Sequence, residues 1–215
     1  MGESVEYGGE TYETVKIGNQ NWFKRNLNYE VEGSRCFDNS PANCDKYGKL
    51  YDWATAMNLN TTCNTSTCAS QVKAKHQGIC PDGWHIPSNE DWNVLMKFVD
   101  ASCSDNRSCG KAGTKLKATS GWPTGGSYKA GTDNYGFSAL PSGYGNSGSS
   151  GDFFADSYNA GFYGVWWSSS EKNDVSDAYY DIWITAKLAM HIAIPVRNAC
   201  IVFVVLKTEG AVSVV

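Results

Sequence analysis

Eight cysteines constrain this 215-residue chain more than any other feature of its sequence. Six of them form three close pairs: Cys36 with Cys44, Cys63 with Cys68, and Cys103 with Cys109. Each pair closes a short loop rich in Asn, Asp, Ser and Thr, which is too polar to build a core of its own and which a disulfide can hold. The two cysteines that are left, Cys80 and Cys200, would then form a fourth, long-range bridge.

Zinc binding is the alternative interpretation of these cysteines. The C-x4-C and C-x5-C spacings are wider than the usual C-x2-C of a zinc site, and the chain has only three His. The spacing therefore favours disulfides, which implies an oxidising compartment and a secreted or cell-surface protein. The N-terminal residues show neither a basic start nor an apolar stretch, so we expect the export signal to be missing from this chain.

Charge and hydropathy exclude two kinds of partner. The chain carries 18 basic and 22 acidic residues, a net charge of −4, without the basic excess that is typical of nucleic-acid-binding proteins. The longest apolar run, residues 199–206, is much shorter than the roughly 20 residues that cross a bilayer. We therefore expect neither a nucleic-acid partner nor a membrane span.

Local patterns predict strands at both ends of the chain and two helices between them. Residues 11–17 and 21–23 are expected to pair through a Gly-Asn-Gln turn. A first helix is expected over 49–57. A second helix follows Ser88, which forms a capping-box pattern with Asp91.

The C-terminal part predicts further strands, rich in Val, Ile, Tyr and Trp, over 165–169, 178–185 and 190–206. The order of strands, two helices, loops and strands predicts an α+β domain in which the N- and C-terminal strands share one sheet.

The segment 121–170 differs from the rest of the chain in composition. It holds 11 of the 22 glycines and 12 of the 28 aromatic residues but only four charged residues. No helical or strand period persists through it, and so many aromatic side chains argue against disorder. We therefore expect long ordered loops over a core.

Several motifs in a fixed order resemble one known family. They include Tyr47-Gly48-Lys49-Leu50-Tyr51, Cys80-Pro81-Asp82-Gly83-Trp84-His85-Ile86-Pro87-Ser88, Gly136-Phe137-Ser138-Ala139-Leu140-Pro141 and Trp167-Ser168-Ser169. Over roughly residues 10–200, the chain resembles the Fibrobacter succinogenes major paralogous domain, which is found in bacterial secreted and surface proteins.

This resemblance implies a single domain over residues 1–215 with a C-type lectin-like fold: two helices, a small antiparallel sheet that joins the N- and C-terminal strands, and long ordered loops. The fold is also similar to that of formylglycine-generating enzymes and of the hypervariable ligand-binding proteins of diversity-generating retroelements. Family members usually end in Ser-Val-Arg-Cys, whereas this chain continues after Cys200, so residues 201–215 form an atypical tail. Its apolar start predicts a buried strand, an edge strand that self-associates in a structural or assembly role, or an altered sequence.

The sequence shows few of the residue patterns that known catalytic sites require. Formylglycine-generating enzymes need a late pair of cysteines to hold copper, and this chain offers only Cys200 there. His76, His85 and His191 lie in no Gly-x-Ser-x-Gly context, and a lone His more often has a structural role. We therefore expect no enzyme, with a formylglycine-generating-enzyme-like oxidase or another enzyme as the alternative.

Ligand recognition is the function that the composition of residues 121–170 favours. Tyr, Trp, Ser, Gly and Asn occur there in the proportions of a binding surface, because rigid rings give contact area and small polar residues give adaptable hydrogen bonds. Packing over the core is the alternative role of these rings, and it is the one we expect for Trp122, Phe137, Leu140 and Trp167. The candidates for contact with a glycan or a cell-surface protein are Tyr128, Tyr135, Tyr144, Phe154, Tyr158, Tyr163, Tyr180 and Trp183.

No cofactor is predicted, and calcium is the one ion for which oxygen ligands are present. The candidate ligands are Asp133, Asp152 and Asp156. The Glu-Pro-Asn and Trp-Asn-Asp motifs of calcium-dependent sugar binding are absent from the sequence, and Asp133 has a second interpretation as the cap of a loop.

Overall fold

The computed structural model of the chain describes residues 3–103, 109, 111–146, 156–158, 160–171, 179–185, 190–192, 199–200 and 206–208. In β5 and from β7 onward it describes the backbone path, with the side chain of Ile184 in addition. The strands are β1 (Ser4–Tyr7), β2 (Glu10–Ile17), β3 (Gln20–Phe23), β4 (Tyr144–Asn146), β5 (Asp156–Tyr158), β6 (Tyr163–Glu171), β7 (Tyr179–Thr185), β8 (Met190–Ile192), β9 (Ala199–Cys200) and β10 (Leu206–Thr208). The helices are α1 (Pro41–Tyr47), α2 (Trp53–Ala56), α3 (Asn89–Val99) and α4 (Ala112–Leu116), with short 3-10 turns η1 (Phe37–Asn39), η2 (Thr61–Asn64) and η3 (Ala69–Gln71).

The two ends of the chain meet in one sheet. Its strand order is β1-β2-β3-β10, and β10 runs antiparallel to β3 with Leu206 opposite Trp22. Gly18 turns β2 into β3 at a φ of +61°, which glycine adopts without strain. The expected sharing of a sheet by N- and C-terminal strands is confirmed, and the described part of the tail pairs within its own chain.

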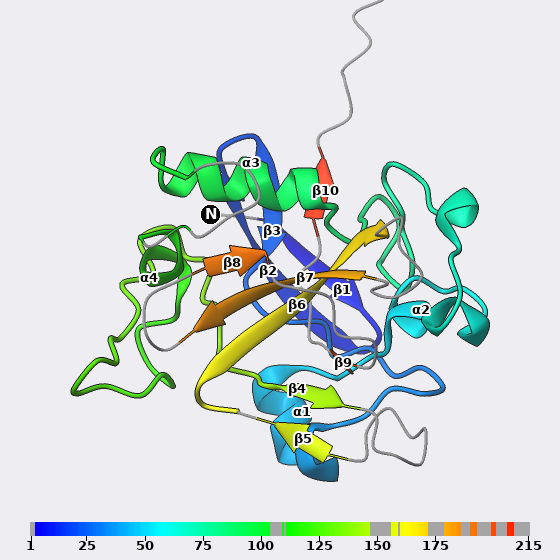
Figure 1. Cartoon of the computed structure of the whole chain (residues 1–215), viewed down its shortest axis with the longest axis horizontal. Helices are drawn as coiled ribbons and strands as arrows, with labels where there is room; N and C mark the ends of the chain where they lie inside the picture. The colour runs from blue at the N-terminus through cyan, green and yellow to red at the C-terminus, as the bar shows by residue number, and fades with distance from the viewer. Residues whose placement is uncertain are drawn as a thin grey trace, which may run out of the picture.

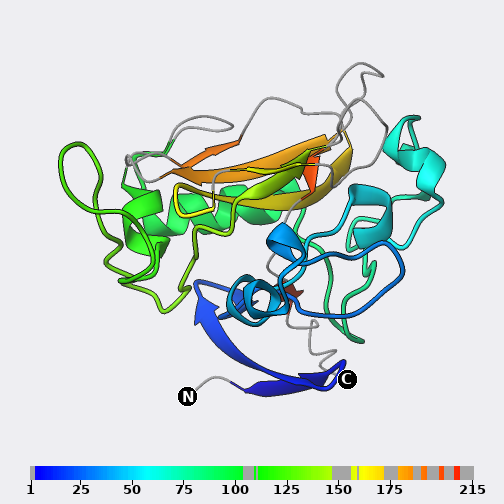
Figure 2. The same cartoon turned by 90° about the horizontal axis from the view of Figure 1, so that it is seen from below.

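Two further antiparallel sheets complete the mixed α+β architecture. Their strand orders are β6-β7-β8 and β5-β4-β9. Figure 1 shows β6 crossing the middle of the molecule with β7 and β8 beside it, and Figure 2 shows α3 between this sheet and the N-terminal strands. Trp92 of α3 bridges the layers, because its ring lies 5.0 Å from Trp22 of β3 and 6.4 Å from Trp166 of β6.

Helix α3 begins where the sequence predicts. The Ser88 hydroxyl accepts a hydrogen bond from the Asp91 amide, and the Asp91 carboxylate accepts one from the Ser88 amide, which completes a capping box. Burial raises the pKa of Asp91, but hydrogen bonds from His85 and Ser88 outweigh it and leave that pKa below its usual value. The cap thereby fixes the helix that carries Trp92 into the core.

Tryptophans of β6 and α2 tie distant segments together through their indole nitrogens. Trp166 donates to the Asn26 side chain at 2.8 Å, and Trp167 donates to the Tyr51 carbonyl at 2.9 Å. Trp53 of α2 donates in turn to the Ser168 carbonyl at 3.0 Å. All three side chains are buried, so these hydrogen bonds form within the core and hold β6 against the segments around residues 26 and 51.

Three of the four expected disulfides are present: Cys36–Cys44, Cys63–Cys68 and Cys103–Cys109. The expected Cys80–Cys200 bridge is not formed, since Cys80 is a buried free cysteine. Cys200 belongs to β9, which pairs with β4. Burial raises the pKa of the Cys80 thiol well above its ordinary value, so the group stays protonated.

The expected helix over 49–57 is wrong in its first half. Gly48 ends α1 with a φ of +78°, and Leu50 then forms an extended bridge with Arg35 through hydrogen bonds of 2.8 and 3.0 Å. The helix begins only after Asp52, whose carboxylate accepts from the Thr55 amide. Helices α1 and α4 were not predicted, so the two expected helices become four in the described residues.

The C-terminal strands also differ from the expectation. The loops expected over 121–170 contain β4 and β5 in addition to β6, and within the strand expected over 190–206 the structure describes β8, β9 and the first residue of β10. The strands expected over 11–17, 21–23 and 165–169 are confirmed as parts of β2, β3 and β6, and the strand expected over 178–185 is confirmed from residue 179 as β7. Among the described helices, none has the length and apolar character needed to cross a membrane.

Candidate functional site

The start of β6 lies beside β4 and gathers several of the predicted aromatic residues. Gly143 and Gly164 form a parallel bridge, and the Gly143 amide donates to the Tyr163 carbonyl at 2.7 Å. Tyr144 follows directly, and across β4 and β5 it stands opposite Tyr158. Gly164 is required at this point, because a Cβ there would overlap the Trp166 ring.

The loop before β6 adds a ring that the sequence interpretation missed. Phe162 is 42% exposed, and its ring packs edge-on against Tyr128 with 5.7 Å between centroids. The Gly161 amide donates to the Pro141 carbonyl at 2.8 Å, and this hydrogen bond holds the loop against the segment that leads into β4. We call Tyr128, Tyr144, Phe162 and Tyr163 the aromatic corner; the three tyrosines are half-buried and pack against the core. Phe162 had no local signal of its own beyond its Gly-rich surroundings.

A buried lysine supports the loop that carries Tyr128. The Lys117 ammonium group donates to the Lys129 carbonyl at 2.7 Å and lies 5.1 Å from the centre of the Trp122 ring. Trp122 itself donates to the Ala139 carbonyl at 2.8 Å. Burial lowers the pKa of Lys117. These contacts give a Gly-rich loop a defined path and position Tyr128.

Of the other predicted contact residues, Tyr135 lies apart from this group. Tyr135 packs instead against Phe98 of α3, with ring centroids 5.9 Å apart. Tyr180 and Trp183 lie in β7, where the structure describes the backbone, and the same holds for Tyr158 in β5. Phe154 lies outside the described residues.

The predicted core aromatics are where they were expected. Trp122, Phe137 and Trp167 are at most 5% exposed. Leu140 differs, since it is half-buried.

Asp133 acts as the cap of a loop. Its two carboxylate oxygens accept hydrogen bonds from the Ser138 amide at 2.9 Å and the Ser138 hydroxyl at 2.7 Å. Asp156 is described by its backbone alone, and Asp152 lies outside the described residues. Within the described part of the chain, no three His, Cys, Asp or Glu side chains come together as a metal site would require.

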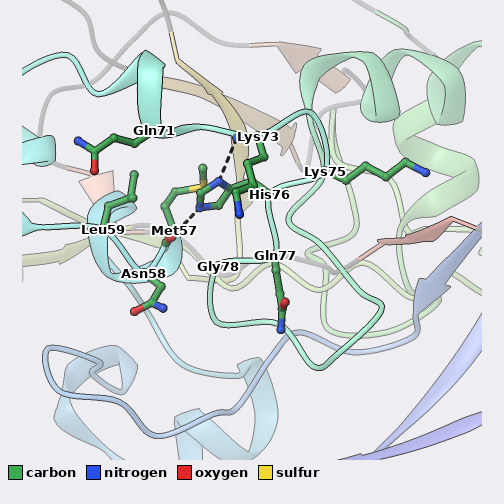
Figure 3. Close-up of a pocket in the computed structure, with 9 residues that line it drawn as sticks. All are labelled: Met57, Asn58, Leu59, Gln71, Lys73, Lys75, His76, Gln77 and Gly78. Atoms are coloured by element: carbon green, nitrogen blue, oxygen red, sulfur yellow. Dashed lines mark hydrogen bonds between the residues drawn. The ribbon is translucent and has the colours of Figure 1, made fainter.

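A hollow of about 510 Å³ lies at the end of α2 and was not predicted. Figure 3 shows the residues that line it: Met57, Asn58, Leu59, Gln71, Lys73, Lys75, His76, Gln77 and Gly78. The only sequence signal is a short basic run around residues 73–76 in an otherwise acidic chain.

His76 holds one wall of this hollow. Its Nε2 lies 2.7 Å from the Met57 carbonyl, and its Nδ1 accepts from the Lys73 amide at 3.2 Å. Because Nδ1 accepts a hydrogen bond and Nε2 faces a carbonyl oxygen, the ring proton is placed on Nε2. Both ring nitrogens of this buried His are therefore engaged by backbone groups, as a structural His requires. His85 is likewise paired, with Asp91 at 3.3 Å, whereas the side chain of His191 lies outside the described part.

Comparison with known proteins supports one assignment. No curated protein and no solved structure shows a significant match. The model of the Fibrobacter succinogenes major domain matches residues 15–201, a range that includes α1 to α4 and the strands from β3 to β9. A match over most of the chain establishes the relationship, and the chain therefore belongs to the Fibrobacter succinogenes major domain family.

Proposed function

We propose that this protein is a non-catalytic recognition domain, secreted or displayed on a cell surface, with a C-type lectin-like fold and a binding surface at the aromatic corner. The observation that carries the proposal is the exposed Phe162 ring packed edge-on against Tyr128. A ring held in place by a second ring loses little conformational freedom on binding, which is the property of an aromatic contact residue.

The surroundings of the corner support the same function. Tyrosine hydroxyls and exposed backbone in Gly-rich loops offer hydrogen bonds, and ring faces offer apolar area to the C–H side of a sugar or to a protein side chain. The disulfides support an extracellular setting, because such bonds persist in oxidising compartments. The engagement of His76 and His85 with neighbouring groups supports a role without catalysis.

The test is binding to a glycan array and to a panel of cell-surface proteins, with the full chain and with Phe162→Ala and Tyr128→Ala variants. Loss of one exposed ring is expected to weaken binding by about tenfold or more. The matched control is Phe98→Ala, since Phe98 is 53% exposed and packs against Tyr135 with nearly the same geometry. The proposal fails if all three variants bind as the unchanged chain does, or if Phe98→Ala alone loses binding.

A further inference from the structure

The hollow at the end of α2 is rigidly built, although it is open to solvent. Gly78, with a φ of +56°, sits so close to the Ala56 carbonyl that no side chain fits there, and the Ile79 amide donates to that carbonyl at 3.0 Å. The Gln77 side-chain amide donates to the Cys80 carbonyl and to Asp82 at 3.0 and 3.1 Å. One wall is thereby fixed before any ligand arrives, which lowers the entropic cost of binding.

The opposite wall is held by a disulfide. Gln71 ends η3, and its amide donates to the carbonyl of Cys68 at 2.8 Å. Cys68 is bonded to Cys63, and its own amide donates to the Glu171 carboxylate at the end of β6. The hollow therefore lies between a cross-linked loop and the end of α2, and its shape does not depend on a partner.

The charge of the hollow is opposite to that of the whole chain. Two of its nine lining residues are lysines and none is Asp or Glu, while the chain as a whole carries a net charge of −4. In Figure 3 the Lys73 side chain runs beside the His76 ring, whereas Lys75 extends away from the other residues. Because Lys73 lies among the other lining residues in this view, its ammonium group is the better placed of the two to meet a ligand.

We propose that this hollow binds an acidic sugar unit, a ring that carries a carboxylate, as a second site separate from the aromatic corner. The Lys73 ammonium group pairs with the carboxylate. The carboxamides of Asn58 and Gln71 hydrogen-bond to hydroxyls, and the half-buried Leu59 supplies apolar contact. A volume of about 510 Å³ is within the range of small-molecule sites and is large enough for a single sugar ring.

The experiment is a calorimetric titration of the full chain with tri-galacturonate and with the neutral galactose trisaccharide of the same linkage. Lys73→Ala is expected to weaken tri-galacturonate binding by about tenfold or more, as loss of a hydrogen-bonded charge does. The matched control is Lys75→Ala, which removes the same charge two residues away and is expected to cost less than about threefold. Binding is also expected to weaken at high salt.

Three results would overturn this proposal: equal losses in Lys73→Ala and Lys75→Ala, equal binding of the neutral trisaccharide, or displacement of tri-galacturonate by a tri-glutamate peptide at the same concentration. Phe162→Ala separates the two proposals. It is expected to leave tri-galacturonate binding unchanged, and a parallel loss would show that the acidic sugar sits at the aromatic corner instead. Failure of the titration leaves the array test of the corner unaffected.

Discussion

Aromatic side chains serve two regions of this molecule in different ways. In the core, Trp92 lies within 6.4 Å of Trp22, Phe137 and Trp166, and all four rings are at most 1% exposed. In the aromatic corner, Phe162 packs against Tyr128 and stays 42% exposed. Ring burial stabilises the fold in the first region, whereas the second region keeps apolar area that folding has not used.

The largest effect is expected from Trp166→Ala. This side chain is fully buried and donates to Asn26, so its removal leaves a large cavity and an unpaired amide oxygen. We expect a loss of about 3–5 kcal/mol in the free energy of unfolding, measured by urea denaturation. Phe162→Ala, only four residues earlier, is expected to cost less than about 1 kcal/mol. Similar losses in the two variants would break the distinction between core and corner.

Substitution of the glycines beside these rings is expected to give a smaller loss of stability, again larger in the core than at the aromatic corner. An added Cβ at Gly164 would overlap the buried Trp166 ring and lie 2.6 Å from the Leu140 carbonyl, so we expect Gly164→Ala to cost about 3 kcal/mol. Gly161 has no neighbour within 4 Å of such a Cβ, and its φ of +92° makes Gly161→Ala cost about 1 kcal/mol through strain alone. Thermal unfolding of both variants measures the difference, and a reversed order would contradict the packing described for β6.

Low pH is expected to reduce the free energy of unfolding, because it protonates Asp91 in the capping box of α3. The pKa of Asp91 is lower in the folded chain than in the unfolded one, so its stabilisation is complete above the unfolded pKa, about 3.9, and is lost as the pH falls through the folded value. Asp91→Asn is expected to cost about 1 kcal/mol near neutral pH. The unfolding free energies of the two proteins should then converge as the pH falls through the lowered folded pKa of Asp91. A constant difference across this range would show that the charge of Asp91 does not support the helix.

Local signals allowed the best sequence predictions. The capping pattern of Ser88 and Asp91 lies within four residues, and the helix that it predicts is present. The helix prediction over 49–57 was wrong in its first half because Leu50 pairs with Arg35. A pairing between such separate residues produces no hydrophobic periodicity that the sequence would reveal. Composition likewise indicated three close disulfides but not the position of Cys200, which depends on the register of β9 against β4.

The candidate site could be predicted only in part for the same reason. Tyr128, Tyr144 and Tyr163 stood out because each lies in Gly-rich, weakly charged sequence. Their grouping depends on the bridge between Gly143 and Gly164, which no local pattern encodes. The hollow beside α2 is built from segments around residues 57, 71 and 76, whose approach is fixed by hydrogen bonds of His76 and by a disulfide. The single-domain boundary and the contact role of Tyr180 and Trp183 stay predictions.

The pairing of β10 with β3 also determines the order in which the fold can be completed. Strand β3 leaves the ribosome well before its hydrogen-bonding partner at Leu206–Thr208, because the two lie far apart along the chain. Contacts between such distant segments slow folding, and an unpaired strand edge is prone to join other chains. The sheet that begins with β1, β2 and β3 is therefore completed only after β10 has been made, and the growing chain depends on protection of the β3 edge until then.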